Sequence, residues 1–271
     1  MTQSSHQKNN RYGHQKWIIL HHGSLFAQIL AEILCKSASI MSFEELVLEG
    51  SILIDIEDCH KSTLTINGKE VTHFQSKLMY HEGFYQLGEV LQCYSIADRA
   101  YVQSSWQALL ISMFYQMKRV INPVCPERMG MTAFQLPQTL KIASQVGLVV
   151  PHYEILPQSD SLTQSTLWYT PEKSQQSSVK IQHPRGELVT VVFAKSTKDC
   201  YMYWPDIPLR IRMRLKIMCR MMGLDVGEAY FYVEQHWVFY GIRPYVSEKN
   251  QEGVLEEVAL CIKKFGEDEE G

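Results

Sequence analysis

The chain has 271 residues, 45% hydrophobic and 20% charged, a composition typical of a soluble globular protein with a sizeable core. Its formal net charge of −3 gives no electrostatic reason to expect nucleic acid or a membrane surface as a partner. No apolar run approaches the ~20 residues of a membrane-spanning helix. The seven cysteines are scattered without a C-x-x-C spacing, which favours reduced thiols and a cytoplasmic location over a disulfide framework.

The length predicts about two domains. We assign residues 17–123 to an N-terminal domain and residues 124–265 to a second one. Residues 1–16 are polar and are expected to form a disordered tail, and residues 266–271 an acidic, solvated tail. The Ser-, Gln- and Thr-rich stretch 159–178 is expected to be a loop or flexible linker.

The N-terminal domain opens with a strand–turn–helix pattern typical of α/β folds. Residues 17–20 are apolar, and residues 25–36 have apolar side chains at helical spacing. Alternation predicts strands at 51–57 and 63–71, and Asn67-Gly68 favours a type I′ hairpin within the second. A further extended segment is expected at 71–79, a long helix at 95–118 and a short strand at 119–123.

The second domain begins with an expected helix at 137–146, which has Pro137 in its first turn, and a strand at 148–151. Residues 179–182 and 187–194 are expected to be paired strands, and residues 208–222 a helix that stops at Gly223. The aromatic-rich residues 229–245 indicate two strands around a turn. An amphipathic helix at 251–265 closes the domain, so the expected class is α/β with a C-terminal antiparallel sheet.

Five passages, in this order, resemble those of the ATP-grasp ligases, most closely the RimK-type and microviridin-type peptide ligases. They are Val120-Ile-Asn122-Pro123, Gly147-Leu-Val-Val-Pro151, Gly186-Glu-Leu-Val-Thr-Val-Val192, Gly227-Glu-Ala-Tyr230-Phe231 and Phe239-Tyr-Gly241-Ile-Arg243-Pro244. The resemblance covers residues 17–245. It implies an ATP-grasp-like fold, with a pre-ATP-grasp N-terminal α/β domain and a shortened ATP-grasp core. It also implies a bacterial role in the biosynthesis of ribosomally made, modified peptides (RiPPs).

The positions that bind nucleotide and magnesium in those ligases hold unsuitable residues in this chain. The resemblance places Leu136 where the family has a nucleotide-contacting lysine, and Leu188 where a core strand carries an arginine. The family's magnesium-binding acidic residue and Glu-x-Asn pair correspond to Tyr230, Gly241 and Arg243. These three are poor or impossible ligands for a hard cation, which needs oxygen donors.

The segment between Pro151 and Tyr201 is also short. It is smaller than the central ATP-clamping subdomain that the resemblance implies, and it contains no identifiable glycine-rich phosphate loop. Phosphoryl transfer depends on positive charge and metal at the phosphates. We therefore expect a pseudoenzyme that uses no cofactor, with ATP and magnesium required only if the chain is a ligase after all.

The expected helix at 208–222 is the best candidate for a binding surface, because its basic residues interleave with leucine, isoleucine and methionine. Arg, Met and Trp are enriched at interfaces, so a peptide substrate or partner protein is the expected ligand. The simpler interpretation is a helix with a buried apolar face and solvated arginines. The candidate binding residues are Arg210, Arg212, Arg214, Lys216, Trp204 and Trp237.

Three functions are compatible with the sequence. The first is a non-catalytic ATP-grasp-like protein that binds a peptide or an active ligase, as a homo- or heterodimer. The second is a divergent ATP-dependent carboxylate–amine ligase in which acidic residues such as Glu228 and Glu234 replace the lost metal ligands. The third is a scaffold with an unrelated metal or thiol site.

The third function has weak candidates, each with a simpler structural interpretation. His21-His22 follows the first strand, where α/β folds often bind ligands, but can equally be part of a turn. The polar run from Asp55 to His60 can be a solvated strand end. Cys125 lacks an identifiable activating base and is interpreted as a buried thiol.

Overall fold

The structure is a computed structural model that describes residues 16–48, 50–55, 57–58, 61–66, 69–71, 74–82, 90–123, 136–155, 179–182 and 184–267. The chain divides into two compact units, residues 1–23 with 34–120 and residues 24–33 with 121–271. Most of both predicted tails, and the whole predicted linker at 159–178, lie outside the described residues.

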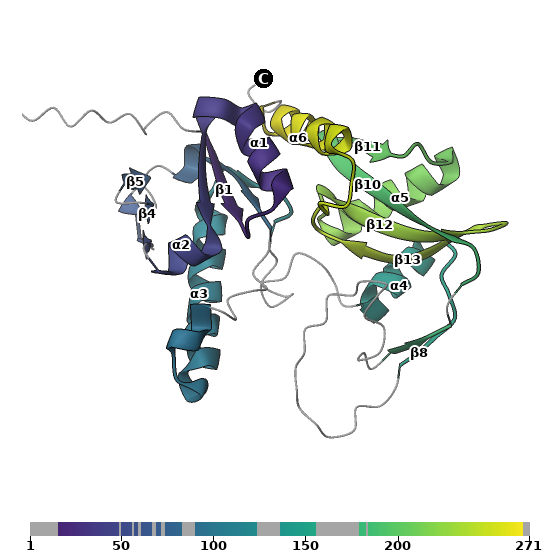
Figure 1. Cartoon of the computed structure of the whole chain (residues 1–271), viewed down its shortest axis with the longest axis horizontal. Helices are drawn as coiled ribbons and strands as arrows, with labels where there is room; N and C mark the ends of the chain where they lie inside the picture. Colours follow the sequence, from purple (N-terminus) through teal and green to yellow (C-terminus); the bar gives the residue numbers. More distant parts are fainter. Residues whose placement is uncertain are drawn as a thin grey trace, which may run out of the picture. The chain divides into compact units, whose positions relative to one another are not determined.

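The N-terminal unit is built on a parallel sheet with the strand order β2-β1-β6-β7 (Figure 1). The two central strands are buried along almost their whole length, as expected for a parallel sheet covered on both faces. The strands are β1 (Trp17–His21), β2 (Ala38–Ser42), β6 (Leu78–His81) and β7 (Arg119–Val120).

The remaining elements of this unit lie in the connections between the strands of the parallel sheet. They are η1 (Cys35–Ser37), α2 (Phe43–Leu48), η3 (Phe74–Ser76), η4 (Val90–Cys93), α3 (Ile96–Gln116) and the antiparallel strands β3 (Ser51–Leu53), β4 (Thr63–Ile66) and β5 (Lys69–Val71). The long helix predicted at 95–118 is confirmed as α3. No helix in the described ranges is long and apolar enough to cross a membrane.

Pairing of Ile66 with Lys69 confirms the predicted two-residue hairpin between β4 and β5, although Asn67 and Gly68 lie outside the described residues. The strand predicted at 51–57 is shorter, because β3 ends at Leu53. The extended segment predicted at 71–79 is interrupted by η3.

The C-terminal unit is built on an antiparallel sheet with the strand order β11-β10-β12-β13 (Figure 1). Its strands are β10 (Glu187–Thr197), β11 (Cys200–Trp204), β12 (Val226–Val233) and β13 (Trp237–Arg243). Helices α4 (Leu136–Gln145) and α5 (Leu209–Met222) cover one face, and α6 (Glu252–Glu267) packs on β10 from the other. Helix α1 (Leu25–Leu34) belongs mainly to this unit, where the Leu25 N–H donates to Glu248 Oε1 at 2.8 Å.

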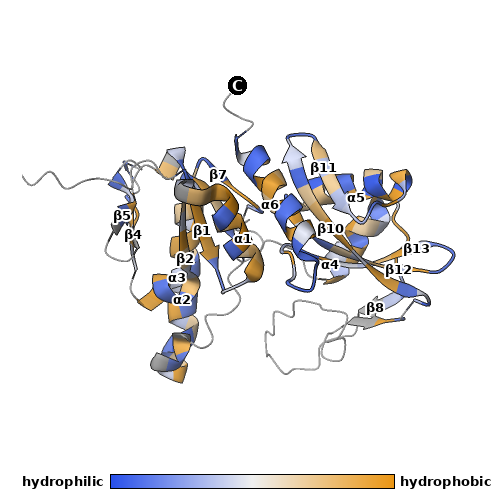
Figure 2. Ribbon diagram, turned by 45° about the horizontal axis from the view of Figure 1, so that its top comes forward, coloured by the Kyte–Doolittle hydropathy of each residue, from blue (hydrophilic) through white to orange (hydrophobic). Residues whose placement is uncertain are grey.

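The core of this unit lies between the sheet and helices α4 and α5. Each strand sends alternate side chains into it, as β geometry requires, and α5 contributes the residues of its inner face. Figure 2 shows the resulting hydrophobic strands beside helices whose ribbons alternate between hydrophilic and hydrophobic residues. The fully buried members include Val191, Phe193, Ala229, Phe231, Phe239, Leu215, Met218 and Met222.

Two of the strand predictions for this unit are wrong. Residues 179–182 do not pair with residues 187–194, because β9 (Val179–Ile181) pairs with β8 (Tyr153–Ile155) instead. Strand β10 takes its partners from β11 and β12. The strand expected at 148–151 is reduced to a single bridge between Val149 and Val238, because Pro151 has no N–H to extend a ladder.

Candidate functional site

The positions that the resemblance assigns to magnesium ligands lie around a buried ion pair. Glu228 on β12 is fully buried, and its strand partner on β13 is Arg243. Two residues further along β12, Tyr230 pairs with Gly241. Residues two apart on a strand point to the same face, so Glu228 and Tyr230 lie side by side on the face opposite helices α4 and α5.

Hydrogen-bond donors surround the carboxylate of Glu228. Its Oε2 accepts from the Tyr230 hydroxyl at 2.7 Å, from Arg243 Nε at 2.7 Å and from Arg243 Nη2. Its Oε1 accepts from the Ser247 N–H and from Asn250 Nδ2, both at 2.6 Å. An ionised carboxylate offers about four lone-pair positions, so five donors leave it no acceptor capacity.

Arg243 is fixed by aromatic rings as well as by charge. Its guanidinium carbon lies 5.3 Å from the ring centre of Tyr230 and 4.9 Å from that of Tyr245, within the range of cation–π attraction. Burial acts to lower the pKa of Arg243, but Glu228 and the neighbouring tyrosines outweigh it and raise the pKa above the ordinary value. Burial and the charge of Glu228 likewise raise the pKa of Tyr230, which keeps its hydroxyl a donor.

These residues do not fit a magnesium ion. Mg²⁺ requires several oxygen ligands at about 2.1 Å in near-octahedral geometry. Gly241 has no side chain, the Tyr230 hydroxyl is engaged as a donor, and Arg243 brings a positive charge to the place where the cation would lie. Glu228 is the remaining carboxylate, and its oxygens are already hydrogen-bonded.

Four of the five positions identified from the motifs come together on one sheet face. Leu188 on β10 pairs with Tyr232, two residues from Tyr230, and is 40% exposed. Tyr230, Gly241 and Arg243 lie along the same face. The fifth position, Leu136, begins α4 and packs against the core on the opposite face.

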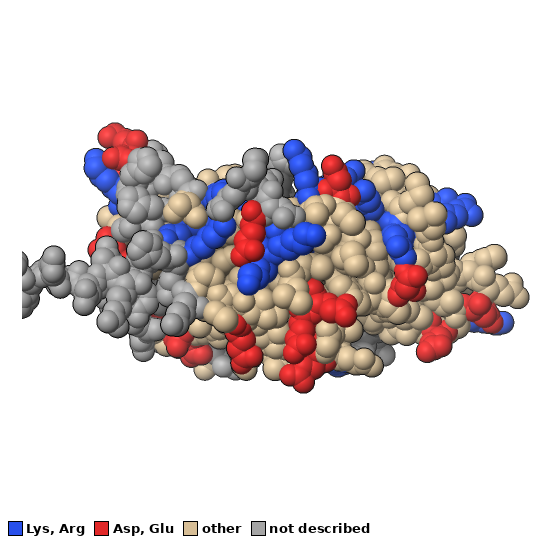
Figure 3. Space-filling model, turned by 90° about the horizontal axis from the view of Figure 1, so that it is seen from above, with Lys and Arg blue, Asp and Glu red and all other residues tan. Residues whose placement is uncertain are grey.

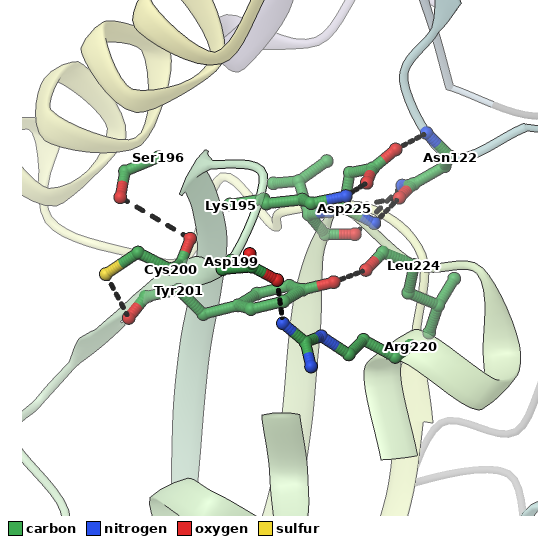
Figure 4. A network of polar contacts seen from close by, with 10 residues as sticks. Asn122, Lys195, Ser196, Asp199, Cys200, Tyr201, Arg220, Leu224 and Asp225 are labelled. Carbon is green, nitrogen blue, oxygen red and sulfur yellow. Dashed lines mark hydrogen bonds and ion pairs between the residues drawn. The ribbon is translucent and has the colours of Figure 1, made fainter. Parts of the chain in front are cut away.

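A second polar network lies beside this sheet and is centred on Asn122 and Asp225 (Figure 4). The Asn122 amide oxygen accepts from the N–H groups of Asp225 at 2.7 Å and Val226 at 3.0 Å. Its amide nitrogen donates to the carbonyl oxygens of Val226 at 2.8 Å and Pro244 at 2.5 Å. Asn122 therefore connects its own motif passage to Pro244, in the last passage, and to Asp225 and Val226, just before Gly227, and it does so as a structural residue.

Asp225 extends this network to strand β10. Its carboxylate accepts from the Asn122 N–H at 3.1 Å and from Lys195 Nζ at 3.2 Å. The same ammonium lies 4.5 Å from the ring centre of Phe265 on α6. The network ties β10, β12 and α6 together, and each of its charges has an opposite charge beside it.

The predicted peptide-binding residues do not form one continuous surface. Trp204 on β11 donates through Nε1 to Glu257 of α6, whereas Trp237 packs edge-on against Phe231 at 5.4 Å in the core on the opposite face. Of the basic residues, Arg212 pairs with Asp206.

The other charges of helix α5 differ in their surroundings. Arg220 pairs with Asp199. Arg214 packs over Gly147, just after the C-terminus of α4, where a cation is favourable for the helix dipole. Arg210 is exposed, and Lys216 is half-buried. The face shown in Figure 3 carries both basic and acidic side chains, in keeping with a chain of small net charge.

The other candidate sites from the sequence are His21-His22, the polar run from Asp55 to His60, and Cys125. The neutral His21 Nδ1 accepts from the Gly23 N–H at 2.7 Å, which is consistent with a turn. Among the described residues, no group of three or more His, Cys, Asp or Glu could hold a metal ion. Cys59, His60 and Cys125 lie outside the described residues.

Sequence reasoning did not identify Ser247 and Asn250 as parts of the site. Both come from the loop between β13 and α6, which supplies two of the donors to Glu228. The sequence contained one signal of this site, because Glu228 and Tyr230 are two residues apart and therefore share one face of a strand. The contribution of the loop carries no such pattern.

Solved structures of several peptide-modifying ligases resemble this chain. Macrocyclase MdnC from Microcystis aeruginosa MRC, bound with precursor peptide MdnA, is 11% identical, with a TM-score of 0.66 over 90% of this chain and 97% of that one. ATP-grasp ligase PsnB, complexed with precursor peptide PsnA2 and AMPPNP, is 11% identical, with a TM-score of 0.62 over 93% and 97%. A Chryseobacterium gregarium RiPP-associated ATP-grasp ligase, in complex with ADP and a leader and core peptide, is 12% identical, with a TM-score of 0.63 over 91% and 96%.

No protein-family model matches the sequence, and no curated protein is similar to it. The predicted ATP-grasp-like fold is confirmed by the structural neighbours, with parallel and antiparallel sheets in the expected order. At these identities the similarity establishes the fold and leaves the reaction to be argued from the site.

Proposed function

We propose that this chain is a non-catalytic ATP-grasp-like protein that binds a peptide or an active partner ligase in peptide modification. Two findings support this function. The fold is shared with peptide-modifying ligases, and the residues of the site do not suit the metal chemistry of such ligases. MdnC, PsnB and the Chryseobacterium ligase were solved with precursor or leader peptides, which supports a peptide as the ligand class.

One observation carries the non-catalytic part of the proposal. The Arg243 guanidinium is paired with the buried Glu228 carboxylate on the sheet face that holds the motif positions. In phosphoryl transfer, metal ions bridge the phosphates and neutralise the developing charge. A guanidinium held by Glu228 and two tyrosine rings supplies at most one positive charge, and it removes the site's carboxylate from metal binding.

The alternative of a divergent ligase requires replacement metal ligands. Glu228 could serve only by giving up its five donors. Glu234 lies just beyond the end of β12, six residues further along an extended strand, so the two residues are separated by about 20 Å. Because of that separation, the two carboxylates cannot share one metal ion.

Calorimetric titration of the purified full chain with Mg-ATP and with Mg-AMP-PNP tests the proposal. We expect no binding heat up to millimolar nucleotide. Micromolar binding would overturn the non-catalytic assignment. In that event, loss of binding in Glu228→Gln would identify Glu228 as a metal ligand, and retained binding would place the ligands elsewhere.

A further inference from the structure

Helix α5 has an apolar ridge on its solvent side. Four large apolar residues are spaced four apart and therefore form one line along the helix, roughly 18 Å long. Their exposed fractions are 69% for Leu209, 59% for Met213, 48% for Ile217 and 49% for Met221. The inner face is also apolar and is fully used in the core.

A helix that is apolar on two opposite faces normally has both faces covered. The inner face of α5 packs on the sheet, so the outer ridge is the face left to be covered. Methionine side chains at two of the four ridge positions suit an adaptable contact, because they are flexible and polarisable.

Basic residues flank the ridge on both sides. At 100° per residue, Arg210 and Arg214 lie on one side of the ridge, and Lys216 and Arg220 on the other. Helix α5 has five basic and no acidic residues, whereas the whole chain has a net charge of −3. Helix α5 is thus strongly basic in a chain that is slightly acidic overall.

Helix stability does not explain the basic residues at the N-terminus of α5. Arg210 and Arg212 lie near the helix N-terminus, where the helix dipole disfavours cations, and no acidic residue occupies the first turn. Arg212 pairs with Asp206, whereas Arg210 has no ion-pair partner in the part of the chain that the structure describes. Arg210 thus violates a local preference without a structural gain, which points to a role in binding.

We propose that the outer face of α5 docks an acidic, amphipathic helical segment of a polypeptide partner. Apolar residues of that segment would pack on Met213 and Ile217, and its carboxylates would lie over the flanking basic residues, of which Arg210 is exposed. A second copy of this chain docked through the same helix is disfavoured, because two strongly basic helices repel each other. This inference rests on the proposed binding function and specifies the partner's chemistry.

The test uses a fluorescein-labelled synthetic helical peptide of about 15 residues, with leucines along one face and glutamates elsewhere. A scrambled peptide of the same composition is the comparison. Anisotropy should show micromolar binding of the amphipathic peptide to the full chain and binding at least about tenfold weaker for the scrambled one. Raising the salt concentration should weaken binding, because the flanking charges are exposed.

Variants locate the contact. Met213→Glu and Ile217→Glu should weaken binding at least about tenfold, and Arg210→Glu severalfold. Leu260→Glu on α6 is the matched control, because Leu260 is 53% exposed and lies on a helix outside the proposed surface. It should leave binding unchanged. Thermal unfolding of each variant checks that it is folded. If a ridge variant is unfolded, Arg210→Glu tests the contact instead, because Arg210 is exposed and its substitution should not disturb the core.

Equal binding of both peptides, or unchanged binding in the ridge and charge variants, would overturn the docking surface. So would a concentration-dependent dimer in sedimentation that Met213→Glu abolishes, since the ridge would then be covered by a second copy. None of these outcomes alters the nucleotide titration, so the docking surface and the non-catalytic assignment can fail separately.

Discussion

Arg243 donates from both Nε and Nη2 to a single oxygen of Glu228, across the β12–β13 strand pair. The side chain of Glu228 is completely buried, and that of Arg243 is 14% exposed. Two opposite charges out of water are stable only with good geometry and further hydrogen bonds, which Tyr230, Ser247 and Asn250 provide here. The pair thus belongs to the folded architecture of the sheet face that carries four of the five motif positions.

Removing the cation from this pair should be strongly destabilising. Arg243→Met leaves the Glu228 carboxylate buried without its countercharge, and we expect a loss of about 3–5 kcal/mol in the free energy of unfolding. Denaturant unfolding measures the loss. Arg243→Lys keeps the charge but not the two-pronged geometry, so it should fall between wild type and Arg243→Met. Equal stability of Arg243→Met and wild type would show that the ion pair does not stabilise the fold.

Periodicity predicted the helices and the central strands of the C-terminal sheet because those elements have strong local patterns. Helix α5 ends at Gly223 in the left-handed conformation, a signal readable in the sequence. The partner of Val179–Ile181 could not be predicted, because an antiparallel strand can pair with any of several strands distant in the sequence. Strand β8, its partner, is too short to have a distinct hydrophobic pattern.

The motif positions could be located from the sequence, but the bonds that fill the site could not. The pairing of Glu228 with Arg243 depends on the register between β12 and β13, which shifts at a bulge after Tyr230. The contributions of Ser247 and Asn250 depend on the path of a loop. Side-chain identity therefore located the motif positions, while tertiary structure determined which bonds their side chains form.

Asn122 should be critical for folding, for two separable reasons. Its side chain satisfies four buried backbone groups, and its φ of 56° lies in the left-handed region. Asn122→Ala loses both benefits and should cost on the order of 3 kcal/mol or more, because buried polar groups are left unpaired. Asn122→Gly loses only the side-chain bonds and should be about 1 kcal/mol less destabilised than the alanine variant. Thermal and denaturant unfolding compare the two. Equal stability of the alanine and glycine variants would show that the left-handed backbone conformation of Asn122 does not contribute.

Two glycines of the C-terminal unit should respond oppositely to alanine. A Cβ at Gly227 would lie 2.1 Å from the Arg243 carbonyl oxygen and 2.9 Å from the Phe193 ring, so Gly227→Ala forces β12 and β13 apart. We expect a loss of about 1–3 kcal/mol or more. Gly253, near the start of α6, has no atom within 4 Å of the position that a Cβ would take, so Gly253→Ala should be neutral or stabilise by up to about 1 kcal/mol. Denaturant midpoints measure both, and a destabilised Gly253→Ala would contradict the expected open space.

His21 should make the stability of the chain depend on pH. Burial lowers its pKa, against the raising effect of Glu82 and Glu45 and with a smaller lowering effect of His22. A histidine whose pKa is lower in the folded state stabilises the fold above its unfolded value of about 6.5, and that stability is lost as the pH falls through the folded value. The melting temperature should therefore fall between about pH 7.5 and 5.5. His21→Asn keeps an acceptor for the Gly23 N–H but cannot titrate, so its fall should be smaller. His236→Asn, at an exposed turn, is the control and should match wild type. If His21→Asn shows the full pH dependence, the effect belongs to other groups.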